Sequence, residues 1–307
     1  MKFGSHLYGT NTLNSDLDIK GVFLPSKEQV LLGRIPKTFR QSTGDSHSKN
    51  TENDIDIELF SLHYFLKIAC EGQTIAIDML HAPHTMIFET SPIWDEIVKN
   101  RSKFYTKNLN AFVGYARRQA SKYGIRGSRL NTAKEFLDIL KKHKPENRLK
   151  EVWSILPLTD HSRIVPPTPN GIRQYQICGK IIQETVTIQH AINIMAKYYH
   201  EYGHRAKLAA ENKGIDWKAV SHAIRAAMQI KELLLTGTIE FPLKSRELLK
   251  EIKTGQHDYS TFVAPLLEDL MKETETLSAQ SKLPDKADYE FWDAWLIDIL
   301  DNFYILG

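Results

Sequence analysis

The sequence predicts an α+β protein: a small α/β unit of about 100 residues, followed by a mostly α-helical region with an inserted β-hairpin. Two stretches near the N-terminus, Asp16–Val22 and Asp54–Phe60, alternate apolar and polar residues, which is the period of a strand. From Ser61 onward, apolar residues recur every three or four positions, which is the period of a helix. The composition, with 42% apolar and 25% charged residues, is that of a water-soluble globular protein.

Both predicted strands carry acidic residues at alternate positions. Because successive side chains point to opposite sides of a strand, Asp16 and Asp18 are expected to share one face. Asp56 and Glu58 are expected to share a face of the second strand for the same reason. The segment between the strands, Ser42–Asp54, is polar and is predicted to be a mobile hairpin loop.

Helices are predicted over most of the remaining chain. The first has an apolar stripe from Leu62 to Ala69 and ends at Gly72. The stretch of residues 163–178 is rich in proline and flanked by β-favouring residues, which predicts a β-hairpin. The other helices are expected over Leu109–Tyr123, Thr132–Lys142, Ile181–Tyr202, Asp216–Leu235 and Asp288–Ile305.

Several protein classes are excluded by simple counts. No window approaches the roughly 18 consecutive apolar residues of a transmembrane helix, and the first residues do not form a secretion signal. We therefore expect a cytoplasmic protein without a membrane partner. Its two cysteines, Cys70 and Cys178, are too far apart for a metal-ligand pair and are expected to be buried thiols.

Charge is distributed unevenly along the chain. Residues 1–100 hold 9 Lys and Arg against 13 Asp and Glu, whereas residues 101–150 hold 14 against 3. A basic segment of this kind favours a phosphate-rich partner, although a well-solvated helix surface can also be rich in lysine.

The opening stretch GSHLYGTNTLNSDLDIKGVF combines a Gly-Ser turn with two closely spaced carboxylates. Asp16 and Asp18, joined by a third carboxylate from the neighbouring strand, would form a cluster of hard oxygen ligands suited to Mg²⁺ and substrate phosphates. Gly4 lets the backbone approach a phosphate closely, and the Ser5 hydroxyl can hold a phosphate oxygen. Residues 6–9 are predicted to form a short helical turn next to this site.

This opening pattern resembles the signature of the DNA polymerase beta-like nucleotidyltransferase superfamily. The string FGSHLYGTNTLNSDLDIKGVF, followed by DIELFSLHYFLKIACEGQTIAIDMLHAP, is similar to a branch of predicted nucleotidyltransferases that is linked to RNA repair and frequent in phages. Looser similarity in YARRQASKYGIRGSRL, YQICGK and DWKAVSHAIRAAMQIKELLLTGTIEFPL extends over most of the chain. The resemblance implies a catalytic core with a small mixed sheet over residues 1–100 and a helical substrate- and nucleotide-binding region over residues 101–307.

The resemblance also implies roles for individual residues. The catalytic carboxylates would be Asp16, Asp18 and Asp56, which together hold two Mg²⁺ or Mn²⁺ ions; Glu58 is the alternative third ligand. The nucleotide triphosphate would be held by Gly4, Ser5, Gly9 and Ser15. One departure stands out, because relatives have a helix and a strand before the Gly-Ser turn and here only Met1 to Phe3 precede it. The first strand is therefore short, or its support comes from elsewhere.

The function implied is transfer of a nucleoside monophosphate from a nucleoside triphosphate, ATP among the candidates, to a hydroxyl, with RNA as a candidate acceptor and pyrophosphate as the product. Two other functions are considered. One is a non-catalytic or antitoxin-like protein that binds nucleotide or RNA. The other is a zinc peptidase, because HEYGH, His200 to His204, fits the spacing of two zinc ligands, with Glu232 imaginable as a third. The continuation of that motif expected in metzincins is absent.

Further polar residues are candidate contacts for nucleotide or acceptor. The glycine-interrupted basic segment offers Arg118, Lys122, Arg126 and Arg129 for phosphates, with a solvated helix surface as the alternative. A polar stripe is formed by Lys218, His222, Arg225, Gln229 and Glu232. It offers Lys218, His222 and Arg225 as candidate contacts, with a water-facing helix edge as the alternative. Asp78 stands in an apolar setting, and it is either functional or the partner of a buried arginine or a cap.

Overall fold

The computed structural model describes residues 1–13, 15–44, 54–107, 128–159, 161–210 and 212–304, with residues 128–129 and 202–210 described by their backbone alone. The chain forms two compact units. Unit 1 contains Met1–Arg117, Ser221–Gln256 and Asp269–Gly307; unit 2 contains Arg118–Val220 and His257–Glu268. Because the chain returns to unit 1 twice, the units do not follow a single boundary near residue 100. The functional division into residues 1–100 and 101–307 stays a prediction.

Unit 1 is built on a three-stranded mixed sheet with the order β1-β3-β2. β1 (Leu17–Phe23) and β3 (Ile55–Ser61) are parallel, and β2 (Thr38–Ser42) is antiparallel to β3. Both predicted strands are confirmed with a shift of one residue. β2 is a strand that the sequence pattern does not predict, because four of its five side chains are exposed and leave no apolar alternation. Residues 45–53 of the expected loop lie outside the described residues.

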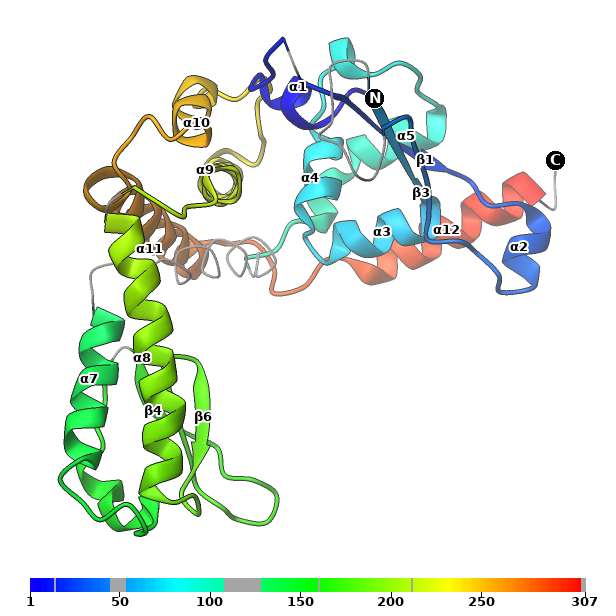
Figure 1. The fold of residues 1–307 in the computed structure, drawn as a ribbon. Helices are drawn as coiled ribbons and strands as arrows, with labels where there is room; N and C mark the ends of the chain where they lie inside the picture. The colour runs from blue at the N-terminus through cyan, green and yellow to red at the C-terminus, as the bar shows by residue number, and fades with distance from the viewer. Residues whose placement is uncertain (14, 45–53, 108–127, 160, 211, 305–307) are drawn as a thin grey trace. The chain divides into compact units, whose positions relative to one another are not determined.

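Helix α3 (Leu62–Cys70) follows β3 directly and packs against β1, β3 and α12 (Tyr289–Tyr304) (Figure 1). The predicted apolar stripe of α3 is buried, which confirms its orientation toward the core. The other helices of unit 1 include α1 (Gly4–Tyr8), α2 (Lys27–Leu31), α4 (Thr74–Leu80), η1 (His84–Met86), α5 (Pro92–Lys99), η2 (Arg101–Phe104) and α10 (Arg246–Lys253). Among the described residues, no helix has both the length and the apolar character needed to cross a membrane.

Two long helices, α9 (Trp217–Thr236) and α11 (Ala264–Gln280), begin in unit 2 and continue into unit 1. α9 confirms the predicted helix over Asp216–Leu235, and α12 confirms the predicted closing helix. The expected helix over Leu109–Tyr123 falls on residues outside the described part of the chain.

Unit 2 combines helices with a second small sheet. α7 (Ser128–Leu140) and α8 (Ile188–Ala210) lie side by side (Figure 1), and the antiparallel strands follow the order β4-β5-β6. Its core contains Phe136, Tyr175, Ile182 and Met195, each at most 1% exposed. The remaining elements are β4 (Ser162–Val165), β5 (Gln174–Ile177), β6 (Lys180–Gln183), η3 (Leu149–Ile155) and the π-helical turn η4 (Tyr259–Val263).

The hairpin predicted near residues 163–178 is present, but a third strand follows it. Cys178 and Gly179 both have positive φ, +48° and +81°, and connect β5 to β6 in a two-residue turn. Two consecutive positive φ angles are the requirement of a type I′ hairpin turn. The predicted helix over Ile181–Tyr202 is therefore wrong at its start, because residues 180–183 pair with β5 and α8 begins only at Ile188.

The residues before the Gly-Ser turn are held by two neighbours. Lys2 forms a β-bridge with Ile19, and the Phe3 N–H donates to the Asp18 carbonyl at 2.8 Å. On the other side, the Lys2 N–H donates to the Met86 carbonyl at 2.7 Å. Support for this short N-terminal segment thus comes from β1 and from the residue that ends η1.

Candidate functional site

The site is built on one face of the mixed sheet, where two acidic side chains occupy neighbouring positions. Asp18 of β1 is the register partner of Asp56 of β3. Paired residues of adjacent strands point to the same face, and adjacent strands are about 4.8 Å apart. The two aspartates that the sequence assigns to the site therefore lie side by side, and the pairing that brings them together follows from the parallel register alone.

Glu58 occupies the next row on this face and is already neutralised from both sides. Its register partners are Lys20 on β1 and Arg40 on β2. The Lys20 Nζ lies 2.7 Å from one carboxylate oxygen, and the Arg40 Nε donates to the other at 2.7 Å. Burial opposes ionisation of Glu58, but the hydrogen bonds from Lys20 and Arg40 outweigh it and lower the pKa of this carboxylate. Glu58 therefore functions as a structural ion-pair partner in this geometry.

The Gly-Ser turn lies directly against Asp18. Gly4 has φ +58°, in the left-handed region where glycine is the favoured residue. A Cβ atom at Gly4 would lie 2.9 Å from Cγ of Asp18 and closer still to Oδ2. The glycine is thus required both by its backbone conformation and by its approach to this carboxylate.

Ser5 provides a polar atom that has no internal partner. Its Oγ is buried and forms no hydrogen bond with any described residue. A buried hydroxyl without a protein partner is costly, and a water molecule or a bound group can supply the missing hydrogen bond. The Ser5 hydroxyl is therefore free to serve the phosphate-binding role predicted for it.

The remaining predicted residues near the turn have clear local roles. Asp16 precedes β1 by one residue, so it lies at the entrance of the strand and not within it. Ser15 closes a turn, because its hydroxyl accepts the Thr12 N–H at 2.9 Å. Gly9 ends α1 with φ +73°, and a Cβ there would lie 2.7 Å from Cβ of Pro242. Nucleotide contacts by Ser15 and Gly9 stay predictions.

Asp78 lies at the centre of a buried polar cluster that we call the Asp78 cluster, formed with Tyr8, Arg225 and Gln229. Its carboxylate accepts hydrogen bonds from Tyr8 Oη at 2.8 Å, Arg225 Nη1 at 3.0 Å and Gln229 Nε2 at 2.7 Å. The Arg225 guanidinium also lies 3.9 Å from the centre of the Tyr8 ring. Of the two roles considered for Asp78, partnership with a buried arginine is the one that the structure supports.

Ionisation in this cluster follows from its contacts. Burial raises the pKa of Asp78, but three donors converge on its two oxygens and favour the carboxylate. Burial would lower the pKa of Arg225, yet the surrounding groups raise it, so the guanidinium is charged. Burial likewise raises the pKa of Tyr8 well above its usual value, so its hydroxyl is protonated and able to donate.

Other residues predicted to contact nucleotide or acceptor lie outside this site or outside the part of the chain that the structure describes. Lys218 is exposed and belongs to unit 2, whereas His222 is half-buried in unit 1. Arg118, Lys122 and Arg126 lie outside the described residues, and so does the side chain of Arg129. In the HEYGH motif, His200 is exposed and Glu201 lies 4.0 Å from Lys197, while the side chain of His204 is not described.

Comparison with known proteins agrees with this geometry. The chain matches the model of the RNA repair pathway DNA polymerase beta family (RlaP) over residues 1–143. It is also similar to an uncharacterized 38.9 kDa protein from the nrdC-mobD intergenic region of Enterobacteria phage T4, with 35% identity over 334 residues that cover 99% of this chain and 95% of the relative. The chain belongs to the RNA repair pathway DNA polymerase beta family. The resemblance drawn from the opening motif is thereby confirmed.

The RNA repair pathway DNA polymerase beta family is of the nucleotidyltransferase type. Its match covers the whole of β1, β3 and the Gly-Ser turn, which carry the predicted site. No solved structure matches the chain. The similarity to the phage T4 protein covers 99% of this chain and therefore extends through unit 2 as well.

The donor set suits a divalent cation in part. Within the described ranges, no three His, Cys, Asp or Glu side chains are grouped closely enough to hold one ion. Asp18 lies against Gly4 and is paired with Asp56 on the adjacent strand, and Mg²⁺ binds proteins through one or two carboxylates together with substrate phosphates. The residues present therefore fit an ion that is completed by a bound nucleotide.

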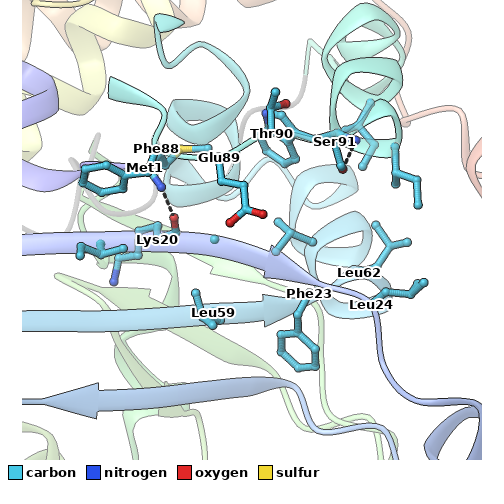
Figure 2. Close-up of a pocket in the computed structure, with 16 residues that line it drawn as sticks. Met1, Lys20, Phe23, Leu24, Leu59, Leu62, Phe88, Glu89, Thr90 and Ser91 are labelled. Atoms are coloured by element: carbon cyan, nitrogen blue, oxygen red, sulfur yellow. Dashed lines mark hydrogen bonds between the residues drawn. The ribbon is translucent and has the colours of Figure 1, made fainter. Parts of the chain in front are cut away.

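A separate hollow of about 450 Å³ lies along β1 and is lined by neither Asp18 nor Asp56. Figure 2 shows Met1 donating from its amino group to the Lys20 carbonyl, with Glu89 reaching toward β1. Apolar side chains that include Leu59, Leu62 and Phe88 form much of its wall. This hollow is distinct from the predicted family site.

Sequence reasoning missed one member of the Asp78 cluster, Tyr8. Gln229 belongs to the predicted polar stripe, because it follows Arg225 by one helical turn, but its partnership with Asp78 was not predicted. No comparable signal marks Tyr8, because its partner Asp78 is 70 residues away.

Proposed function

We propose that this protein is a divalent-cation-dependent nucleotidyltransferase that moves a nucleoside monophosphate from a nucleoside triphosphate to a hydroxyl of RNA. The observation that carries the proposal is the juxtaposition of Gly4 with Asp18 and of Asp18 with Asp56. It joins a glycine turn to two carboxylates, in a chain whose family is of the nucleotidyltransferase type. Asp16, at the entrance of β1, is the third carboxylate that the resemblance implies, and it is not grouped with Asp18 and Asp56 around one ion in this geometry.

In the proposed reaction, the acceptor hydroxyl oxygen forms a bond to the α-phosphorus, and the bond from that phosphorus to the pyrophosphate oxygen breaks. The hydroxyl proton passes to solvent or to a carboxylate, and pyrophosphate leaves. Mg²⁺ or Mn²⁺, held by Asp18 and Asp56 together with the phosphates of the nucleotide when bound, would stabilise charge on the reacting phosphates. The Ser5 hydroxyl would donate a hydrogen bond to a phosphate oxygen. The absence of a side chain at Gly4 would allow the phosphate to approach the backbone closely.

The choice of RNA as acceptor is supported by charge. Unit 2 holds 18 Lys and Arg against 11 Asp and Glu, whereas unit 1 holds 22 against 26. A basic unit is attracted to a phosphate backbone, and the contacts that result weaken with salt. The description of the family as part of an RNA repair pathway supports the same acceptor.

The test is transfer of label from each α-labelled ribonucleoside triphosphate to RNA in the presence of Mg²⁺, with pyrophosphate release measured in parallel. Asp18→Asn and Asp56→Asn are expected to lower transfer at least about 100-fold, because each removes several kcal/mol of transition-state stabilisation. Asp298→Asn is the matched control, since Asp298 is an exposed carboxylate in α12 of the same unit.

Three results would contradict parts of this proposal. Wild-type transfer by the Asp18→Asn, Asp56→Asn double variant would remove the carboxylates from the reaction. Binding of a triphosphate with Mg²⁺ but without pyrophosphate release would favour the non-catalytic nucleotide binder. Label transfer to protein in place of RNA would keep the reaction and replace the acceptor.

A further inference from the structure

The helix that carries the Gly-Ser turn cannot hold its own position. α1 has only five residues, and isolated helices shorter than about 12 residues are marginal in water. Its place must therefore be set by tertiary contacts. At its first end, the Phe3 N–H is bonded to the Asp18 carbonyl. At its last end, the Tyr8 carbonyl accepts the Leu243 N–H at 3.2 Å.

A side-chain contact adds a third constraint on the position of α1. Tyr8 is the last residue of α1, and its hydroxyl donates to Asp78 on α4. The same carboxylate is held by Arg225 and Gln229 on α9, which are themselves bonded to each other at 3.0 Å. Tyr8 is thus clamped from two helices, with the guanidinium against its ring and the carboxylate at its hydroxyl.

We propose that the Asp78 cluster is a positioning device for triphosphate binding: through Tyr8 it holds α1 so that the Gly4-Ser5 turn stays against Asp18. Tyr8, Asp78, Arg225 and Gln229 are positioning residues that act through this turn. The identification of the ligand as a triphosphate rests on the proposed function, whereas the inference that the Asp78 cluster positions α1 does not.

The arrangement couples distant parts of the chain to one small turn. Arg225 is 147 residues from Asp78, and Gln229 is 151 residues from it. α9 therefore contributes to the site through its contacts with Asp78 and Tyr8. Binding groups must be held to within roughly 0.5 Å to be effective, and a five-residue helix meets this demand through tertiary contacts such as this clamp.

The test compares two Tyr→Phe variants, each of which removes one buried hydroxyl group. Tyr8→Phe removes the hydroxyl bonded to Asp78 and keeps the ring against Arg225. Tyr105→Phe is the matched control, because the Tyr105 hydroxyl is also buried in unit 1 and bonds to His81 Nε2 at 2.9 Å, in a different cluster. Thermal unfolding of both variants measures the general cost of losing a buried hydroxyl.

Two measurements are made on each variant. The first is hydrogen exchange of the backbone amides of residues 4–10, which is expected to be about tenfold faster in Tyr8→Phe and unchanged in Tyr105→Phe. The second is the affinity for each of the four ribonucleoside triphosphates with Mg²⁺. It is expected to fall about tenfold in Tyr8→Phe and to change less than about twofold in Tyr105→Phe.

The outcomes separate this inference from the proposed function. Unchanged exchange of residues 4–10 in Tyr8→Phe overturns the positioning role, whatever the protein binds. Equal loss of affinity in both variants also overturns it, because the effect would then be general destabilisation. If the wild-type protein binds none of the triphosphates, the proposed function fails, and the exchange measurement still decides whether the cluster positions α1.

Discussion

Replacing Gly4 by alanine perturbs the contact between the Gly-Ser turn and Asp18 more directly than any other single change. A residue with a side chain at φ +58° bears about 1–2 kcal/mol of backbone strain. The new methyl group would also lie 2.9 Å from Cγ of Asp18, well inside the roughly 3.5 Å at which carbon atoms pack. Either α1 or the Asp18 carboxylate must therefore move.

Gly33→Ala separates these two effects. Gly33 has φ +62°, nearly the same backbone conformation, and no described heavy atom lies within 4 Å of the position that its Cβ would take. This variant has the backbone strain without the clash. The lower conformational entropy of its unfolded chain stabilises the folded state by about 0.4–1 kcal/mol, which offsets part of the strain. Gly33→Ala is expected to lower the free energy of unfolding by about 1 kcal/mol, and Gly4→Ala by clearly more.

The assays are urea unfolding for stability and transfer of label from triphosphate to RNA for activity. Gly4→Ala is expected to lower transfer at least about 100-fold, because a misplacement of about 1 Å in a reacting site costs this much. Gly33→Ala is expected to keep transfer within about twofold of the wild type. If Gly4→Ala and Gly33→Ala have the same activity, the contact between Gly4 and Asp18 has no role in the site.

Three further predictions concern stability and reactivity. Burial lowers the pKa of His81 from 6.5 to about 4, so only the unfolded state gains a proton between these values. His81 is therefore expected not to reduce the free energy of unfolding above pH 6.5. In urea titrations that free energy is expected to fall by about 3 kcal/mol as the pH is lowered from 6.5 to 4. Glu58→Gln is expected to cost about 1–3 kcal/mol in the same assay, because Lys20 loses a partially buried partner. Burial raises the pKa of the Cys70 thiol to about 12, so iodoacetamide at pH 8 is expected to leave it unmodified in the folded protein.

Each of these three has a control that can contradict it. The His81→Gln variant should show a flatter pH dependence between pH 4 and 6.5, and an unchanged slope would assign the effect to other groups. Glu96→Gln, an exposed change on α5, should cost less than about 0.5 kcal/mol, and an equal cost would deny Glu58 a special role. Cys70 should react fully once the protein is unfolded in urea; reaction at the same rate without urea would refute its burial.

The sequence alone was sufficient to predict those strands and helices whose formation depends on residues close to one another along the chain. The alternation of apolar and polar residues predicted β1 and β3, and the three- and four-residue spacing predicted α3, because both periods reflect which side of an element is buried. The Gly-Ser turn and the two aspartates of the opening motif could likewise be selected before any fold was known. The one strand of this sheet that local pattern missed, β2, is mostly exposed and carries no such period.

Only the tertiary structure decided which polar groups meet. The parallel register places Asp18 beside Asp56 and Lys20 beside Glu58, and a shift of one residue would have placed an apolar residue of β3 beside Asp18 in place of Asp56. The partner of Asp78 lies on α9, 147 residues away. A buried charge is stable only when an opposite charge or a hydrogen-bond donor or acceptor is paired with it. Which groups are paired depends on how distant segments of the chain pack. Local sequence therefore determined the elements and the chemistry that they carry, whereas folding determined which carboxylates are neutralised and which stand beside the Gly-Ser turn.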